Sequence, residues 1–181
     1  MVKQKTIVLG VTGSIAAYKS ADILRRLIEK GFRVSVVMTS EAEHFITPLT
    51  LSSLAGEEVY RGIFDKNQQA GSMPHIELAK QADLVLIAPA TANTIGKLAC
   101  GLADDLLSCI VLGTKAPILI VPAMNVEMYQ NKIVQENCAK LKKHGVDFVD
   151  PIVGKLACGD FGAGHIADVD SIVKKVLKVI G

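Results

Sequence analysis

Five short apolar runs recur along the chain, and longer stretches with helical spacing of apolar residues separate them. The runs are rich in β-branched residues and lack polar alternation, which is typical of strands buried on both faces of a parallel sheet. We expect strands at residues 6–10, 33–38, 84–88, 117–121 and 147–149. The order strand, helix, strand favours a doubly wound fold. The predicted fold class is therefore α/β, a single-domain Rossmann-like (flavodoxin-like) parallel sheet with helices on both faces.

Amphipathic helical patterns fill the intervals between the strands. The first runs over residues 14–30, with Ile23, Leu24 and Leu27 on its apolar face and Gly31 as its stop. We expect further helices at residues 48–55, 93–100, 104–112, 132–144 and 169–180. Two segments, 61–74 and the glycine-rich 154–164, look irregular. Such segments are candidate functional loops, although many loops only connect elements.

Composition narrows the class of protein. The 181 residues fit one domain spanning 1–181, half of them are apolar and 21% are charged, so the chain is globular. A net charge of +2 without a basic cluster argues against a nucleic-acid partner. No apolar stretch approaches the roughly 20 residues of a membrane-spanning helix. The four cysteines lack C-x-x-C spacing, so we expect no metal site and no disulfide frame, and a cytoplasmic location.

The exit of the first strand has the features of a phosphate site. It reads Gly10-Val11-Thr12-Gly13-Ser14 and leads directly into a helix, whose first N–H groups and dipole suit an anion. The third glycine of a dinucleotide fingerprint is missing, and Thr39 and Ser40 follow the second strand where an acidic residue would bind a ribose. A mononucleotide phosphate or a flavin fits better. Alternatively, Ser14 serves only as a helix N-cap.

Two further strand exits carry polar side chains. Thr91, Asn93 and Thr94 follow Pro89 at the end of the third strand, although Asn93 can equally be a helix N-cap. Asn125 follows Pro122-Ala123-Met124 at the end of the fourth strand. Ligands of open parallel sheets bind at such carboxyl ends, so Asn125 can hold a carboxylate or a carbonyl. Taken alone, the segment is equally consistent with an ordinary turn.

Two residues outside the strand exits are candidates for proton chemistry. His75 follows Pro74 and opens a helical turn after the first irregular segment, a position where a histidine is often merely solvated. Cys158 lies in Ala157-Cys158-Gly159-Asp160, and the nearby glycines favour a lid that brings an accessible thiol over a ligand. A loop cysteine without a role is the alternative.

Together these motifs resemble those of the homo-oligomeric flavin-containing Cys decarboxylases, over essentially the whole chain. The resemblance implies FMN as cofactor and His75, Asn125 and Cys158 as catalytic residues. It also implies substrate contacts from Asn125, Lys155 and Ala157, and a homotrimer or dodecamer with FMN at the subunit contacts. The implied FMN contacts are Gly13, Ser14, Ile15, Thr39, Ser40, Thr91, Ala92, Asn93, Thr94 and Ala123.

The implied chemistry explains why these groups belong together. A cysteine derivative cannot simply lose CO₂, because its thiol offers no sink for the remaining electrons. Hydride transfer from the thiol-bearing carbon to flavin gives a thioaldehyde, and decarboxylation then leaves an enethiolate. On this interpretation Asn125 binds the departing carboxylate, His75 assists thiol deprotonation, and Cys158 supplies a proton when the hydride returns. The coenzyme A branch of the family makes phosphopantetheine from phosphopantothenoylcysteine in this way.

Several alternatives stay open from the sequence. A lantibiotic peptidyl-cysteine decarboxylase shares the Asn and His motifs but releases the oxidised enethiol, so Cys158 favours the coenzyme A branch. A flavin prenyltransferase, a non-catalytic flavin-binding regulatory protein and a flavodoxin-like electron carrier need no such set of residues. The family pattern has arginine where this chain has His165. Many bacterial relatives continue into a phosphopantothenate–cysteine ligase, so we expect that ligase on the same or another chain.

Overall fold

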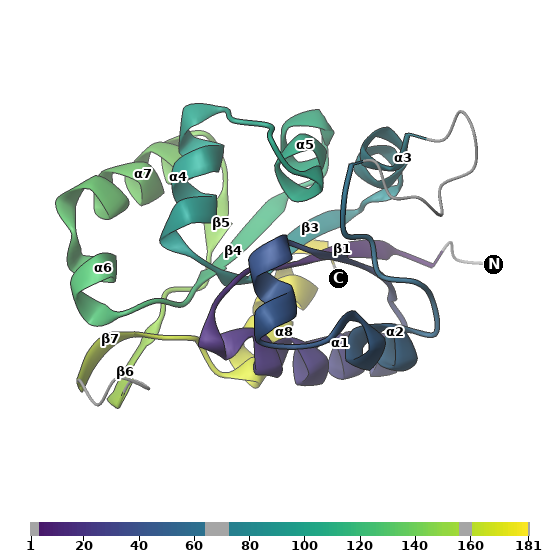
Figure 1. Ribbon diagram of the computed structural model, residues 1–181, viewed down its shortest axis with the longest axis horizontal. Helices are drawn as coiled ribbons and strands as arrows, with labels where there is room; N and C mark the ends of the chain where they lie inside the picture. Colours follow the sequence, from purple (N-terminus) through teal and green to yellow (C-terminus); the bar gives the residue numbers. More distant parts are fainter. Residues whose placement is uncertain (1–3, 64–72, 156–160, 181) are drawn as a thin grey trace.

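The computed structural model describes residues 4–63, 73–155 and 161–180. Five parallel strands form the central sheet in the order β2-β1-β3-β4-β5, with bounds Thr6–Val11, Arg33–Met38, Leu84–Ala90, Ile118–Pro122 and Asp147–Phe148 for β1 to β5. This order and the helices on both faces (Figure 1) confirm the flavodoxin-like α/β prediction. All five predicted strands are present, and β3 extends past Ala88 to Ala90.

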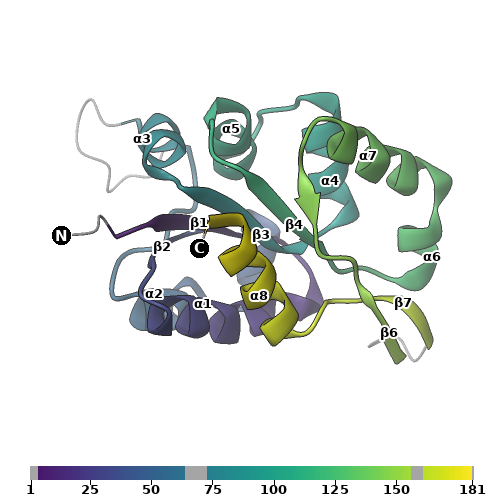
Figure 2. The same cartoon turned by 180° about the vertical axis from the view of Figure 1, so that it is seen from behind.

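The helices divide between the two faces of the sheet (Figures 1 and 2). One face is covered by α1, α2 and α8, at Lys19–Glu29, Pro48–Ala55 and Val169–Ile180. The other is covered by α3, α4, α5 and α7, at Pro74–Gln81, Ala92–Cys100, Leu106–Gly113 and Lys132–Lys143. Among the described residues, no helix has the length and apolarity needed to span a membrane.

Alternating strand residues supply the two halves of the core. In β1, Ile7 and Leu9 pack toward α1 and α8, while Val8 packs on the opposite face. All six residues of β1 and all seven of β3 are buried. Burial on both faces is why these strands read as continuous apolar runs in the sequence.

Short elements at the carboxyl edge of the sheet differ from the sequence prediction. The predicted helix 14–30 is split into a 3₁₀ turn, η1 (Ile15–Tyr18), followed by α1, and a second 3₁₀ turn, η2 (Ser40–His44), follows β2. A short helix, α6 (Val126–Gln130), follows β4. Gly31 ends the first helix as predicted, with a positive φ of 87°.

The glycine-rich segment 154–164 was predicted to be irregular, and that prediction is wrong at both of its ends. Strands β6 (Ile152–Lys155) and β7 (Phe161–His165) form a separate antiparallel pair. A Cβ at Gly164 would lie 2.4 Å from the Met124 carbonyl oxygen, and one at Gly162 would lie 2.6 Å from Val126 Cγ2. The Met124 N–H also donates to the Gly164 carbonyl at 3.1 Å. Glycine therefore allows β7 to lie directly against the segment that carries Asn125.

We expect Gly164→Ala to destabilise the fold by about 2 kcal/mol, since its new methyl group meets a backbone oxygen that cannot easily move. Urea unfolding of the purified protein measures this loss. Gly154→Ala is the matched control, because its added Cβ meets nothing closer than 3.9 Å. Equal stabilities of the two variants would contradict the close approach of β7 to residue 124.

Candidate active site

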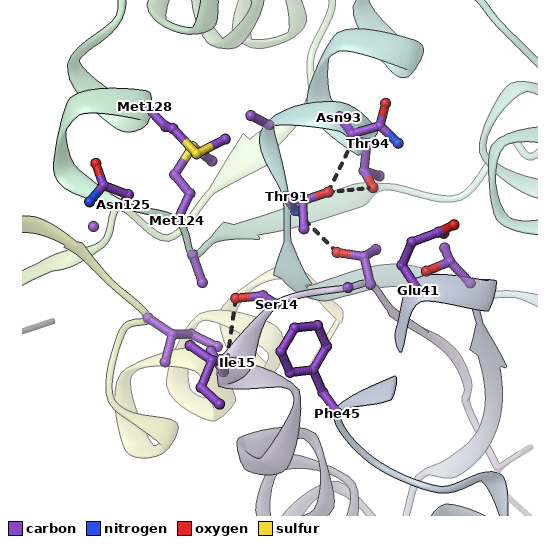
Figure 3. Close-up of a pocket in the computed structure, with 18 of the residues that line it drawn as sticks. Ser14, Ile15, Glu41, Phe45, Thr91, Asn93, Thr94, Met124, Asn125 and Met128 are labelled. Atoms are coloured by element: carbon purple, nitrogen blue, oxygen red, sulfur yellow. Dashed lines mark hydrogen bonds between the residues drawn. The ribbon is translucent and has the colours of Figure 1, made fainter. Parts of the chain in front are cut away.

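A cavity of about 740 Å³ opens at the carboxyl edge of the sheet, beside the exits of β1, β3 and β4. This volume lies within the range of sites for small molecules and cofactors. Figure 3 shows side chains from η1, η2, the start of α4 and the segment leading into α6 around one space. Every predicted FMN contact except Ser40 lines this cavity, so the topology brings together residues that are far apart in the sequence.

The turn after β1 forms one wall. A Cβ at Gly13 would lie 2.4 Å from Glu41 Cβ, so only glycine lets this turn pass beneath η2. Ser14 caps η1, and its hydroxyl accepts a hydrogen bond from the Ala16 N–H at 3.3 Å. Ser14 also lines the cavity. Ser14 therefore serves as the N-cap of η1 and also faces the cavity, so the two interpretations drawn from the sequence do not exclude each other.

The exit of β3 forms a second, hydroxyl-rich wall. Thr91 is the N-cap of α4, and its side chain accepts a hydrogen bond from the Thr94 N–H at 3.3 Å. The two threonine hydroxyls lie 3.1 Å apart (Figure 3). Asn93 is not the N-cap, which corrects that alternative from the sequence. It lies in the first turn of α4 and lines the cavity.

The exit of β4 places Asn125 at a third wall. Asn125 is the N-cap of α6, and its Oδ1 accepts a hydrogen bond from the Glu127 N–H at 2.8 Å. Its Nδ2 is therefore the donor end of the amide. Asn125 lines the cavity together with Ala123, Gly164 and His165. The β7 strand and the Asn125 segment thus meet at the same side of the site.

Ser40 is the exception among the predicted contacts. Its hydroxyl donates to the Glu41 carboxylate at 3.0 Å and it does not line the cavity, whereas Thr39 and Glu41 do. The side-chain hydroxyl of Ser40 is occupied within η2. A contact between Ser40 and FMN stays a prediction that the shape of the cavity does not support.

Among the apolar wall residues, only Ile15 was predicted as an FMN contact, and Phe45, Met124 and Met128 were not. Ile15, Phe45, Met124 and Met128 line the cavity, and Ile15, Phe45 and Met128 are 59%, 47% and 49% exposed. Figure 3 shows Phe45 pointing toward the space between Ser14 and Thr91, with the two methionines on the α6 side. The cavity therefore offers exposed apolar surface as well as hydroxyls and amides. The signal available in the sequence was Phe45, an aromatic residue directly after the polar segment 40–44.

Two charged residues, Lys97 of α4 and Asp105 at the N-cap of α5, also line the cavity and were not predicted from the sequence. Lys97 Nζ lies 2.8 Å from an Asp104 oxygen and 3.0 Å from an Asp105 oxygen. These interactions, the hydrogen bond to Asp104 first among them, raise the pKa of Lys97. Burial favours the neutral form of Asp105, but hydrogen bonds from Ser108 and Lys97 outweigh it and lower its pKa. Lys97 is therefore a cation whose charge is already balanced within the protein.

His75, one of the two residues predicted to transfer protons, lies away from the cavity. His75 lies in the first turn of α3 and does not line the cavity. Its Nδ1 is buried and has no hydrogen-bond partner within the part of the chain that the structure describes. Figure 1 shows α3 on the far side of α5 from α6 and β7. Within one chain, His75 and Asn125 are therefore in separate places.

Of the predicted lid, the structure describes only the residues on either side of positions 156–160. Lys155 ends β6, and its backbone pairs with Phe161 at the start of β7. Ala157 and Cys158 lie outside the described residues. At the other end of this segment, Gly164 and His165 line the cavity, and the His165 ring Nδ1 lies 2.9 Å from the Ile166 carbonyl oxygen.

Comparison with known proteins finds similar sequences over nearly the whole chain. A family model described as Flavoprotein matches residues 1–181. A probable phosphopantothenoylcysteine decarboxylase from Streptococcus mutans is 47% identical over 174 residues, which cover 95% of this chain and 97% of the relative. The Coenzyme A biosynthesis bifunctional protein CoaBC of Vibrio vulnificus is 49% identical over 169 residues, or 93% of this chain. The match spans 42% of that longer relative.

Two solved structures share the fold over nearly their whole length. A cysteine-to-serine mutant of PPC decarboxylase complexed with pantothenoylaminoethenethiol superposes with a TM-score of 0.87 at 32% identity, covering 97% of this chain and 98% of the other. The FMN binding protein AtHal3 gives a TM-score of 0.83 at 33% identity, covering 97% and 96%. These comparisons confirm the resemblance inferred from the sequence motifs.

We expect Asp105→Asn to remove about 1 kcal/mol of stability at neutral pH, because asparagine keeps the α5 cap but loses the ion pair with Lys97. The folded-state pKa of Asp105 is lowered, so its contribution is complete above the unfolded value of about 3.9. It is lost as the pH falls through the folded pKa. Urea unfolding from neutral pH down to about pH 3 measures the convergence of variant and parent.

Asp104→Asn is the control for this titration. Asp104 contacts the same lysine but its side chain is 61% exposed, so solvent screens the pair. Its substitution is expected to change stability by less than half as much. A larger effect at Asp104 than at Asp105, or a pH-independent loss at Asp105, would show that the partly buried ion pair between Lys97 and Asp105 is not the cause.

Proposed function

This chain belongs to the Flavoprotein family, and we propose that it is an FMN-dependent phosphopantothenoylcysteine decarboxylase that makes phosphopantetheine for coenzyme A biosynthesis. The observation that supports this most is the convergence of three strand exits, at Ser14, Thr91 and Asn125, on one cavity. The relative from Streptococcus mutans, a probable phosphopantothenoylcysteine decarboxylase, is matched over 97% of its length.

The lining residues fit FMN. The hydroxyls of Ser14, Thr39 and Thr94 and the backbone beside Gly13 suit a phosphate and polar ring atoms. Phe45, Ile15 and the two methionines suit the apolar faces of an isoalloxazine ring. A longer side chain at position 13 would intrude on this arrangement, because its Cβ would meet Glu41. When bound, FMN supplies a hydride acceptor for the thiol-bearing carbon and returns the hydride later.

The protein's own groups then orient the substrate and move protons. Asn125 donates from Nδ2 to the substrate carboxylate and fixes it at the β7 side of the cavity. The apolar side chains of Met124 and Met128 line the same side of the cavity and lower the polarity around that carboxylate, which favours its departure as uncharged CO₂. His75 assists loss of the thiol proton. Cys158 donates a proton in the closing step, and Lys155 and Ala157 contact the substrate.

The separation of His75 from the cavity supports a site shared between subunits. We propose a homotrimer, alone or within a dodecamer, in which His75 of one subunit reaches the cavity of the next. His75 is partly exposed on α3, and Ile15 and Tyr18 at the cavity are each 59% exposed. Both features are accounted for if a second subunit packs at the cavity and presents its α3.

The direct test combines flavin binding with turnover. We expect the purified protein to be yellow and to release CO₂ from phosphopantothenoylcysteine, giving the saturated aminothiol. Cys158→Ser is expected to bleach its flavin and release CO₂ once per site, and then to stall with the unsaturated enethiol, since the returning hydride lacks its proton. Anaerobic single turnovers, followed by flavin absorbance and product mass, measure both steps.

Cys138→Ser is the control for this experiment, because Cys138 is a buried core residue of α7. It should turn over at the parent rate. Formation of saturated aminothiol by Cys158→Ser at the parent rate would refute the role of Cys158. A colourless protein that does not bind FMN would refute the proposed function.

Complementation between subunits tests the shared site. His75→Asn removes the proton acceptor, and Asn125→Asp places a negative charge beside the carboxylate, so each variant alone should be inactive. Mixed trimers contain sites with both native residues only if these come from different subunits. Co-expression should therefore restore about a quarter of the parent activity, which is the fraction expected for random trimers.

Two measurements decide the outcome of this complementation. Light scattering should give the mass of three subunits or a multiple of three for the parent and for the mixture. Mixed oligomers without activity would show that His75 and Asn125 of one site come from the same chain. A stable monomer that carries flavin would refute the proposed trimer.

A further inference from the structure

Thr12 lies at the junction of two strand exits that line the cavity. Its side chain is 1% exposed, and it stands between the end of β1 and the turn at Gly13. The Thr12 hydroxyl donates to the Pro89 carbonyl at 2.8 Å and accepts from the Thr91 N–H at 3.1 Å. One buried hydroxyl thus bridges both segments through its donor and its acceptor.

The bridge lies where the backbone ladder no longer connects these strands. The β1–β3 register ends at the pair Gly10 and Ile87, and the β3–β4 register shifts between Ile87 and Ala90. Up to Gly10, backbone hydrogen bonds join β1 to β3. Beyond Gly10, the side chain of Thr12 joins the two segments instead. The segments that it joins carry Ser14 on one side and Thr94 on the other.

We propose that Thr12 is a positioning residue for the flavin: it fixes the phosphate turn at Gly13 and Ser14 relative to the Thr91–Thr94 wall, and so sets cofactor affinity. This inference rests on the proposed binding of FMN in the cavity. Both walls must contact one rigid ligand at the same time, so a change in their separation weakens binding even when each wall is intact.

Ser20 offers a matched comparison. Its hydroxyl, in α1, donates to the Ala88 carbonyl at 2.8 Å, and the residue is fully buried. It therefore makes the same kind of bond to the carbonyl one residue before Pro89. Ser20 does not line the cavity. Loss of this hydroxyl removes a buried hydrogen bond of the same class without disturbing the link to Thr91.

The experiment compares Thr12→Val, Thr12→Ser and Ser20→Ala. Valine keeps the shape of threonine but leaves the Pro89 carbonyl and the Thr91 N–H without this partner. We expect Thr12→Val to weaken FMN binding about 10- to 100-fold, measured by quenching of flavin fluorescence. Thr12→Ser, which keeps the hydroxyl, and Ser20→Ala should both stay within about 3-fold of the parent.

A second readout separates positioning from general destabilisation. Urea unfolding without flavin should show losses of stability in both Thr12→Val and Ser20→Ala. The visible circular dichroism of the bound flavin at saturation should change only in Thr12→Val, because that signal reports the geometry around the ring. If Thr12→Val fails to fold, Thr12→Cys takes its place, since a thiol is a weak donor and acceptor.

The outcomes distinguish this inference from the function on which it rests. A parent protein that does not bind FMN overturns the proposed function and the role of Thr12 with it. A parent that binds FMN while Thr12→Val binds equally well overturns only the role of Thr12. Equal weakening by Thr12→Val and Ser20→Ala also overturns it, because a general loss of stability then accounts for the effect.

Discussion

Burial of the central strands on both faces is the constraint on which the site depends. Because β1 and β3 are buried along their whole length, they cannot carry groups for a ligand except where they end. The shared direction of the strands brings those ends to one edge. The cavity is therefore built from exit segments, whose hydroxyls and amides also cap the helices that follow. Ser14, Thr91 and Asn125 each combine the two roles.

The same constraint explains what the sequence could predict. Apolar runs located the strands, and the geometry of parallel sheets then placed polar residues after β1, β3 and β4 at one site. Contacts between segments that are distant in the sequence could not be predicted from these patterns. Phe45 and Lys97 reach the cavity through the packing of η2 and α4, and the β6–β7 pair consists of short strands without the alternation that marks a hairpin. His75 was a reasonable candidate, yet its separation from Asn125 is a property of the folded chain.

That separation bears on why a small flavoprotein should assemble. A single layered α/β unit has only one edge of its sheet available for ligands, and here the segments at β1, β3 and β4 occupy it. If His75 on α3 takes part in the reaction as proposed, it must reach the ligand from a neighbouring molecule, because it does not line the cavity of its own chain. In the proposed trimer, assembly completes the catalytic site, and the exposed apolar side chains at the cavity rim become part of a subunit contact.

The charge of the cavity also favours binding by neutral groups. Among the described lining residues, Lys97 is the one lysine or arginine, and Asp104 and Asp105 already balance its charge. Glu41 adds a carboxylate beside Gly13. A cofactor phosphate in this cavity therefore depends on hydroxyls and backbone N–H groups, whose donation is directional and falls off steeply with misalignment. Such a site would tolerate little change in the separation of its walls, which is the physical basis of the role proposed for the buried Thr12 hydroxyl.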